Sequence, residues 1–415
     1  MAERYAYHIA SELSEFRGLI RYLMRVISCQ FSLTFDESET ATDTLIHFSG
    51  DKSIGNYFCD KKIYTTLLTS DASSLSESIQ SDPLAEAFYR MNCLQEFQVP
   101  VTKQDAFGRF DFDHSIQSRD ENPYTDKVSE LFISFLSRFG IKKTQVPPRR
   151  RVLLSHDIDI LHGGLRSELK YILSGQSQMK FSDLISHLSR KHKLWNTIND
   201  IVQIEKEQGV HSIFYFLSTR GIYKGINHAD YTLQEAAAIV KEITSQGAEA
   251  GLHKSAADHS YIEESIKLDF TAPMSNRNHY LRYKLPEDWE GMEAAGIKTD
   301  TGLGWSKTYG LRNSYAHPFH PFTGGRTLDL LCIPLVLMDT TFAKHFRAED
   351  IVPAFQTMVQ SWSNGFTVSV LFHNNYLSRG TNHKFLQAYQ DLLQYLKESN
   401  IETVSTAQIL EEYTG

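Results

Sequence analysis

The sequence lacks the features that mark several classes of protein. Among its 415 residues there are four widely spaced cysteines without a C-x-x-C pair, so we expect neither a disulfide framework nor a thiolate zinc site. The 42 basic residues are outnumbered by 50 acidic ones, for a net charge of −8, which disfavours nucleic acid and anionic membranes as partners. No apolar run reaches the length of a signal peptide or a membrane span, so we expect a cytoplasmic protein.

A change of pattern divides the chain into two parts. A chain of this length is too long for one ordinary core. Two prolines and three arginines in residues 146–151 mark a solvent-exposed linker. We therefore predict a smaller α+β domain of unassigned role in residues 1–146 and a second domain in residues 150–415. Only three of the 17 histidines precede residue 150, so any histidine chemistry is expected in the second domain.

The second domain alternates between strand-like and helix-like segments, which is typical of parallel strands. The expected strands are 212–217, 249–253, 298–301, 330–338, 367–373 and 402–404. The expected helices are 195–208, 233–246, 286–295, 348–362, 385–398 and 406–413. Seven or eight such units predict an irregular (β/α)7–8 barrel of the α/β class. In such a barrel the polar residues that close each strand should gather at one end.

Two acids, Asp157 and Asp159, end an apolar run that begins near Leu153. Side chains alternate along a strand, so both acids should lie on one face together with Ser155, while His156 lies on the other. Neighbouring carboxylates repel each other unless a cation offsets their charge. The pair therefore indicates a nearby metal ion or cationic side chain, although two loop acids that cap the next segment would give the same pattern.

Further polar residues close the later strands, and they are Arg277, His279, Asp300 and His373 in addition to His253. His259 follows His253 by six residues, so the loop between them can turn both imidazoles towards one ion. One Asp with two His residues leaves an open coordination position, as a catalytic zinc site requires. The alternative for His259 is a solvated loop histidine, and Arg277 and His373 have the alternatives of a structural ion pair and a core histidine.

From residue 150 to the C-terminus these motifs resemble the polysaccharide deacetylase superfamily, whose irregular barrel removes acetyl groups from sugars with a divalent metal. The resemblance implies a base at Asp157 that pairs with Arg277, and a catalytic histidine at His373. It implies metal ligands at Asp159, His253 and His259, with five residues between the histidines where the superfamily usually has three. We also expect Asp300, His279 and Tyr280 to contact the substrate.

In the N-terminal part, Glu96-Phe97 and residues 105–110 look like a bacterial branch that joins an N-terminal segment of unassigned role to this barrel. The leading hypothesis is a metal-dependent deacetylase, with Zn²⁺ as the expected metal and an N-acetylated sugar or glycan precursor as substrate. Two alternatives stay open. One is a catalytically inactive carbohydrate-binding or regulatory module, and the other is an amidohydrolase that acts on a non-sugar amide. The sequence gives no indication of the oligomeric state.

Overall fold

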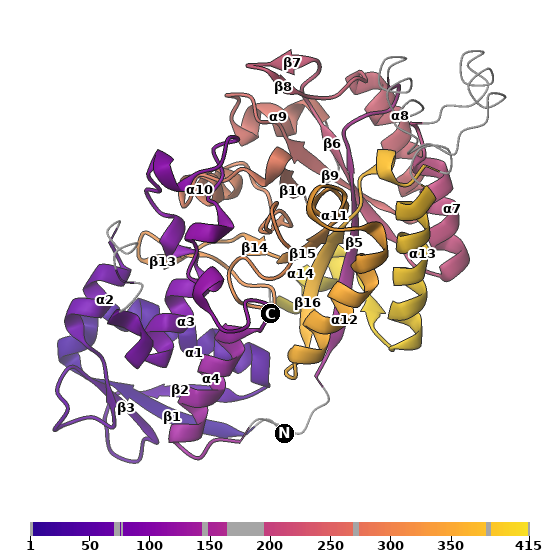
Figure 1. Ribbon diagram of the computed structural model, residues 1–415. Coiled ribbons are helices and arrows are strands. Elements are labelled where there is room, and N and C mark those ends of the chain that lie inside the picture. Colours follow the sequence, from indigo (N-terminus) through magenta and orange to yellow (C-terminus); the bar gives the residue numbers. More distant parts are fainter. Residues whose placement is uncertain are drawn as a thin grey trace, which may run out of the picture.

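A computed structural model describes residues 3–69, 75, 78–142, 148–163, 195–268, 274–378 and 383–413. The N-terminal part lies to one side of a larger α/β part, at the lower left of Figure 1. Residues 143–147, where the expected linker begins, lie outside the described residues. The division into domains at residues 146–150 therefore stays a prediction.

The N-terminal part contains a four-stranded parallel sheet and helices, in agreement with the expected mixture of α and β structure. The strand order is β2-β1-β3-β4, with β1 Arg4–Ile9, β2 Thr34–Ser38, β3 Ile46–Ser49 and β4 Tyr57–Phe58. The helices are α1 Arg17–Phe31, α2 Lys61–Leu67, α3 Pro83–Met91 and α4 Lys127–Arg138. Helix α3 ends at Met91, and Cys93, two residues later, takes a left-handed backbone conformation (φ 50°).

The larger part is built on a nine-stranded parallel sheet in the order β14-β11-β10-β9-β6-β5-β16-β15, with β17 paired to β5. The first five strands in the sequence are β5 Arg150–Ile158, β6 Ser212–Leu217, β9 Glu249–Lys254, β10 Ser275–Asn278 and β11 Thr299–Asp300. The others are β14 Leu331–Cys332, β15 Leu335–Met338, β16 Phe366–Leu371 and β17 Glu402–Thr403. Two small hairpins join β7 Ile222–Tyr223 to β8 Ile226–Asn227 and β12 Phe322–Thr323 to β13 Arg326–Thr327.

Residues 331–338 join the two ends of this sheet into a ring. β14 pairs with β11, and β15, which follows after only two residues, pairs with β16. The N–H of Leu335 donates to the carbonyl of Leu303 (3.1 Å), while the carbonyl of Pro334 accepts from Ser369 (2.7 Å). The single strand expected over 330–338 is thus interrupted at a proline, which has no N–H to donate. The expected barrel is confirmed, with an irregular seam at this segment.

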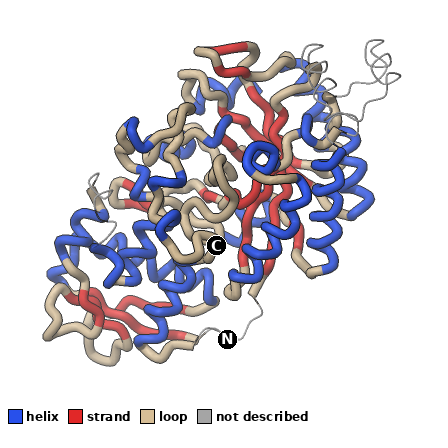
Figure 2. Tube along the Cα trace, in the orientation of Figure 1, coloured by secondary structure: helices blue, strands red, loops and turns tan. Residues whose placement is uncertain are grey.

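Helices surround the strands, as Figure 2 shows. They are α7 Ile198–Gln208, α8 Leu233–Thr244, α9 Tyr261–Leu268, α10 Glu287–Ala294, α11 Asp339–His345, α12 Ile351–Ser361, α13 His383–Glu398 and α14 Thr406–Tyr413. The capping box of Thr232 and Glu235, which the sequence indicates, starts α8. Within the described ranges no helix combines the length and apolarity needed to cross a membrane.

The N-terminal part packs directly against the barrel. The ring of Tyr22 in α1 lies 5.2 Å from that of Phe322, and its hydroxyl donates to the carbonyl of His320 (2.8 Å). One continuous cluster of buried apolar side chains extends from α1 and α3 into the barrel. Burial of apolar surface therefore stabilises the contact between the two parts as it does each core.

Gly251 in β9 provides a test of barrel packing. A Cβ at this position would lie 2.5 Å from the ring of Tyr215 and 2.8 Å from the carbonyl of Ser275. We expect Gly251→Ala to lower the free energy of unfolding by about 1–3 kcal/mol, because the ring and backbone must shift. Gly18→Ala in α1 is the control, since its new methyl group meets nothing closer than 3.6 Å, and it should stabilise by about 0.4–1 kcal/mol. Urea denaturation measures both, and a fully stable Gly251→Ala variant would contradict this packing.

Candidate metal centre

Strand β5 directs two carboxylates to the carboxyl end of the barrel. Asp157 and Ser155 face the interior, where both contact Arg277. His156 faces the opposite side and binds the carbonyl of Phe372 (2.8 Å) and the carboxylate of Glu205 (2.9 Å). The alternation expected from the sequence is therefore confirmed, and Asp159 follows directly after the end of the strand.

Arg277 in β10 is fully buried beside Asp157. Its Nη1 donates to Asp157 Oδ1 (3.0 Å), its Nη2 donates to the Ser155 hydroxyl (2.8 Å), and its Nε donates to the carbonyl of Thr301 (3.2 Å). The guanidinium also lies over the ring of Tyr215, 4.7 Å from its centre. These contacts orient the carboxylate of Asp157 and offset its charge.

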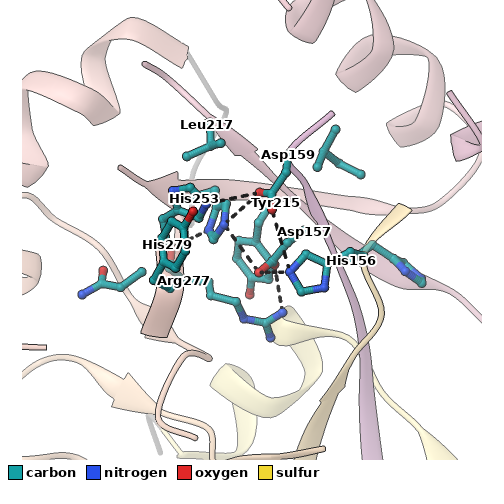
Figure 3. A network of polar contacts seen from close by, with 12 residues as sticks. His156, Asp157, Asp159, Tyr215, Leu217, His253, Arg277 and His279 are labelled. Atoms are coloured by element: carbon teal, nitrogen blue, oxygen red, sulfur yellow. Dashed lines mark hydrogen bonds and ion pairs between the residues drawn. The ribbon is translucent and has the colours of Figure 1, made fainter. Parts of the chain in front are cut away.

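Three potential ligands converge beside this pair, on Asp159, His253 and His279. Their ligand atoms all lie within 4.8 Å of one another, and the side chains point toward one another in Figure 3. Asp159 Oδ1 lies 3.4 Å from His253 Nε2 and 3.8 Å from His279 Nε2. Two atoms bound tetrahedrally to zinc at about 2.0–2.1 Å lie roughly 3.4 Å apart. The spacing of these atoms is close to that of a zinc site.

The polar atoms of this cluster also fit a metal. Asp159 Oδ1, His253 Nε2 and His279 Nδ1 are buried without a hydrogen-bond partner within the described part of the chain, although buried polar atoms nearly always have one. His253 uses its other nitrogen, Nδ1, to contact the carbonyl of Arg277 (2.9 Å), which leaves Nε2 directed at the cluster. The three residues therefore fit a divalent metal.

The charge states of His279 and Asp159 agree with this fit, whereas burial lowers the pKa of His253 but Asp157 and Asp159 raise it above its ordinary value. Burial lowers the pKa of His279 to about 3, so its imidazole is neutral at neutral pH. Burial acts to raise the pKa of Asp159, but the surrounding histidines lower it below its ordinary value. Metal ligation requires a neutral imidazole and an ionised carboxylate, and these two residues meet that requirement.

The structure does not bring His259 into the cluster, in contrast to the expectation from its spacing after His253. His259 is exposed. The backbone N–H of Ser255 donates to Glu264 of α9 (2.9 Å), which turns the chain away from the barrel axis directly after β9. His279, which we expected to contact substrate, occupies the place that the sequence pattern gave to His259.

His373 follows the end of β16, the strand next to β5, and faces the two acids. Its Nε2 lies 3.9 Å from Asp157 Oδ2 and 3.9 Å from Asp159 Oδ2. Its Nδ1 contacts Asp339 Oδ1 (2.7 Å), and its backbone N–H donates to Asp339 Oδ2 (2.7 Å). Burial would lower the pKa of His373, but Asp339 and the two acids raise it to about 9. His373 is therefore protonated at neutral pH.

Sequence reasoning missed Asp339. It directly follows Met338, the last residue of β15, so it closes a strand in the same way as the residues that were singled out. Position at a strand end was the signal that could have found it.

Asp300 and Tyr280, both expected to contact substrate, lie in different environments. Asp300 is fully buried, and both of its oxygens accept from the hydroxyl of Tyr283 (2.9 and 2.7 Å). Burial raises the pKa of Asp300 to about 6. Tyr280 is half-buried directly after His279 and stacks on Phe107 (5.2 Å between ring centres). Contact of these two residues with a substrate stays a prediction.

A cavity of about 670 Å³ adjoins the centre at His279. The barrel contributes Asn278, Tyr261 and the loop that carries His259, and the N-terminal part contributes Gln98 and Gln104. Its volume lies within the range of small-molecule sites.

Comparisons with known proteins add little. No protein-family model matches the chain, and no curated protein is similar to it. Among solved structures, a protein from Mycobacterium smegmatis provisionally described as a polysaccharide deacetylase is similar, with 14% identity and a TM-score of 0.42. The Puue allantoinase is similar with 13% identity and a TM-score of 0.43. Each match covers 65% of this chain and 92% of the other. Values this low support no conclusion about activity, which must come from the chain's own residues.

The metal cluster predicts that two histidine variants behave differently. We expect His279→Ala to weaken zinc binding by more than the roughly 10- to 100-fold cost of losing an outer-shell partner, because it removes a ligand. His259→Ala should bind zinc as the wild type does, because His259 is exposed outside the cluster. Competition with a chelator of known affinity measures the zinc affinity of both variants. Weaker binding by His259→Ala than by His279→Ala would instead support the ligands expected from the sequence, Asp159, His253 and His259.

The contact with Asp339 predicts a pH effect at His373. In Asp339→Asn the pKa of His373 should fall from about 9, because the largest opposing charge is lost. A histidine whose pKa is raised on folding stabilises the protein below its ordinary value of 6.5, and this stabilisation is lost as the pH rises through about 9. An NMR titration of the metal-free protein measures the pKa. Asp350→Asn, at a surface pair with Arg347, is the control, and an unchanged pKa in Asp339→Asn would refute the coupling.

Proposed function

We propose that this protein is a zinc-dependent hydrolase that removes the acetyl group from an N-acetylated sugar or glycan precursor. One observation carries the proposal. A cluster that fits a metal, Asp159 with His253 and His279, lies beside two acid–base groups that each have a buried partner. Those groups are Asp157, paired with Arg277, and His373, paired with Asp339. Metal-assisted hydrolysis uses a metal ion together with a base and an acid.

In the proposed mechanism the divalent ion, when bound, supplies a Lewis acid that activates water for attack on a carbonyl. Asp157 accepts the proton of the attacking water. Arg277 holds Asp157 Oδ1 at 3.0 Å, so the second oxygen of the carboxylate faces the reaction centre. Tyr215 beneath the guanidinium and Ser155 beside it fix that arrangement.

His373 is the proposed general acid. It is protonated in the metal-free state, and Asp339 fixes its ring through Nδ1, so Nε2 faces the centre. From there Nε2 can donate a proton to the departing amine. Asp157 pairs with the cation of Arg277 and is the proposed base. His373 pairs with the buried carboxylate of Asp339 and is the proposed acid.

The cavity beside His279 favours a polar substrate. Gln98 and Gln104 line it, and side-chain amides can bind sugar hydroxyls. A non-sugar amide would satisfy the same reactive groups, and an inactive carbohydrate-binding module would use the cavity alone.

Activity of Asp157→Asn tests the proposal. The zinc-loaded wild type should release acetate from N-acetylated mono- or disaccharides faster than from simple N-alkyl acetamides. In Asp157→Asn we expect kcat to fall by about 10²- to 10⁴-fold, because the base is lost, while zinc stays bound because Asp157 is outside the ligand cluster. Asp329→Asn, an exposed acid that precedes β14 at the opposite end of the barrel, is the matched control.

Each alternative gives a different result in this experiment. Faster release from simple amides would favour an amidohydrolase acting on non-sugar substrates. Sugar binding without zinc and without acetate release would favour the binding module and overturn the proposed function.

A further inference from the structure

The residues that follow His279 have an unusual backbone. Tyr280 and Leu281 both lie in the left-handed region, with φ values of 62° and 52°. Residues with a Cβ rarely adopt this conformation, and it persists where surrounding contacts hold it in place. The contacts that hold these two residues therefore also determine where the imidazole of His279 lies.

The carbonyl of Tyr280 is held by the N-terminal part of the chain. Arg109 Nη1 donates to this carbonyl (3.0 Å), while Asp105 accepts from Arg109 Nε (2.7 Å). From the same turn the ring of Phe107 stacks on that of Tyr280, with 17° between the ring planes. One turn, residues 105–109, thus fixes both the backbone and the side chain of Tyr280.

The carbonyl of Leu281 is held in a parallel way. Arg312 Nη1 donates to Leu281 (3.3 Å) and to the carbonyl of Gly304 (3.1 Å). Glu96 accepts two hydrogen bonds from Arg312, at 2.9 and 2.5 Å, and both side chains are buried. The next residue, Phe97, forms a backbone bridge with Leu285. Two successive carbonyls after a metal-cluster histidine therefore rest on guanidinium groups, each anchored by an acid of the N-terminal part.

We propose that residues 96–109 of the N-terminal part are a positioning element of the metal centre. Through Arg109 and the pair of Glu96 with Arg312 they hold the segment 280–281, and through it they set the place of His279. This inference rests on the proposed function, in which His279 is a metal ligand. Arg109 is not one of the three cluster residues, and although its neighbours Gly108 and Phe110 line the cavity it does not, so its role is to position and not to react. Residues 96–109 also line the adjoining cavity through Gln98 and Gln104, so they adjoin both the metal centre and the cavity.

Variants of Arg109 test the inference without disturbing the buried pair. Arg109→Met removes the donor to Tyr280, whereas Arg109→Lys keeps a charge that can reach one of its two partners. Arg119→Met is the matched control, because Arg119 is exposed in the same part and its side chain makes no hydrogen bond or ion pair with the residues the structure describes.

The first measurement uses the metal-free full-length protein. We expect the amides of residues 280–282 to exchange with solvent roughly tenfold faster in Arg109→Met, as the loss of a hydrogen bond to a charged group predicts. Arg109→Lys should be intermediate, and Arg119→Met should match the wild type. Unchanged exchange in Arg109→Met would show that the turn does not hold this segment and would overturn the inference.

The second measurement is the affinity for Zn²⁺, by chelator competition. Arg109→Met should weaken it by about 10- to 100-fold, the usual cost of losing an outer-shell partner, and Arg119→Met should not. If Arg109→Met shows faster exchange but binds zinc as tightly as the wild type, the turn only packs against residues 280–282 and the positioning role is overturned. Absence of zinc binding by the wild type would instead refute the proposed function, and hydrogen exchange would still decide whether the turn orders residues 280–282.

Discussion

The geometry of the centre depends on one buried guanidinium, that of Arg277. It joins β5, through Asp157 and Ser155, to the chain that leaves β11, through the carbonyl of Thr301. Its own carbonyl contacts His253 Nδ1. Removal of a charge from water costs several kcal/mol unless its partners are well placed, and here a carboxylate, a hydroxyl, a carbonyl and the ring of Tyr215 all offset that cost. Loss of the Arg277 side chain would remove the closest cation from the buried carboxylate of Asp157, whereas the backbone carbonyl that contacts His253 would remain. The proposed base thus depends on the side chain of Arg277, and a proposed ligand depends on its backbone.

The features that the sequence predicted well are those set by local periodicity. The alternation along β5 separates Asp157 from His156, and the apolar run of β6 matches its expected bounds, Ser212–Leu217. His259 shows where this reasoning fails. Its spacing after His253 permitted a shared ion. In the structure Ser260 and Glu263 form a capping box at the start of α9, and His259, directly before this box, is exposed. His279 reaches the cluster through a left-handed backbone at Tyr280, and no periodicity encodes that conformation.

Contacts between distant parts of the chain could not be predicted from the sequence for a different reason. Glu96 and Arg312 are 216 positions apart, and each taken alone looks like an ordinary surface charge. Burial makes the pair informative, because two fully desolvated charges must find each other. The separate N-terminal domain expected from the linker is still compatible with the structure, but its apolar core is continuous with that of the barrel. Composition can indicate where the chain divides, but it does not indicate which residues of the two parts contact each other.

The charges of the centre show which of its residues most favours a bound metal ion. Two neighbouring acids require a cation, and that requirement is met by side chains alone, since Arg277 pairs with Asp157 and a protonated His373 faces both acids. The acids by themselves therefore do not demand an ion. His279 is different. Its imidazole is neutral, buried and without a hydrogen bond at Nδ1 within the described ranges, while its Nε2 lies near Asp159. A neutral imidazole has one nitrogen lone pair, and a Lewis acid would use the lone pairs of His279 and His253 together with Asp159. His279, which precedes the residue whose carbonyl Arg109 of the N-terminal part holds, is thus the residue that most favours a metal.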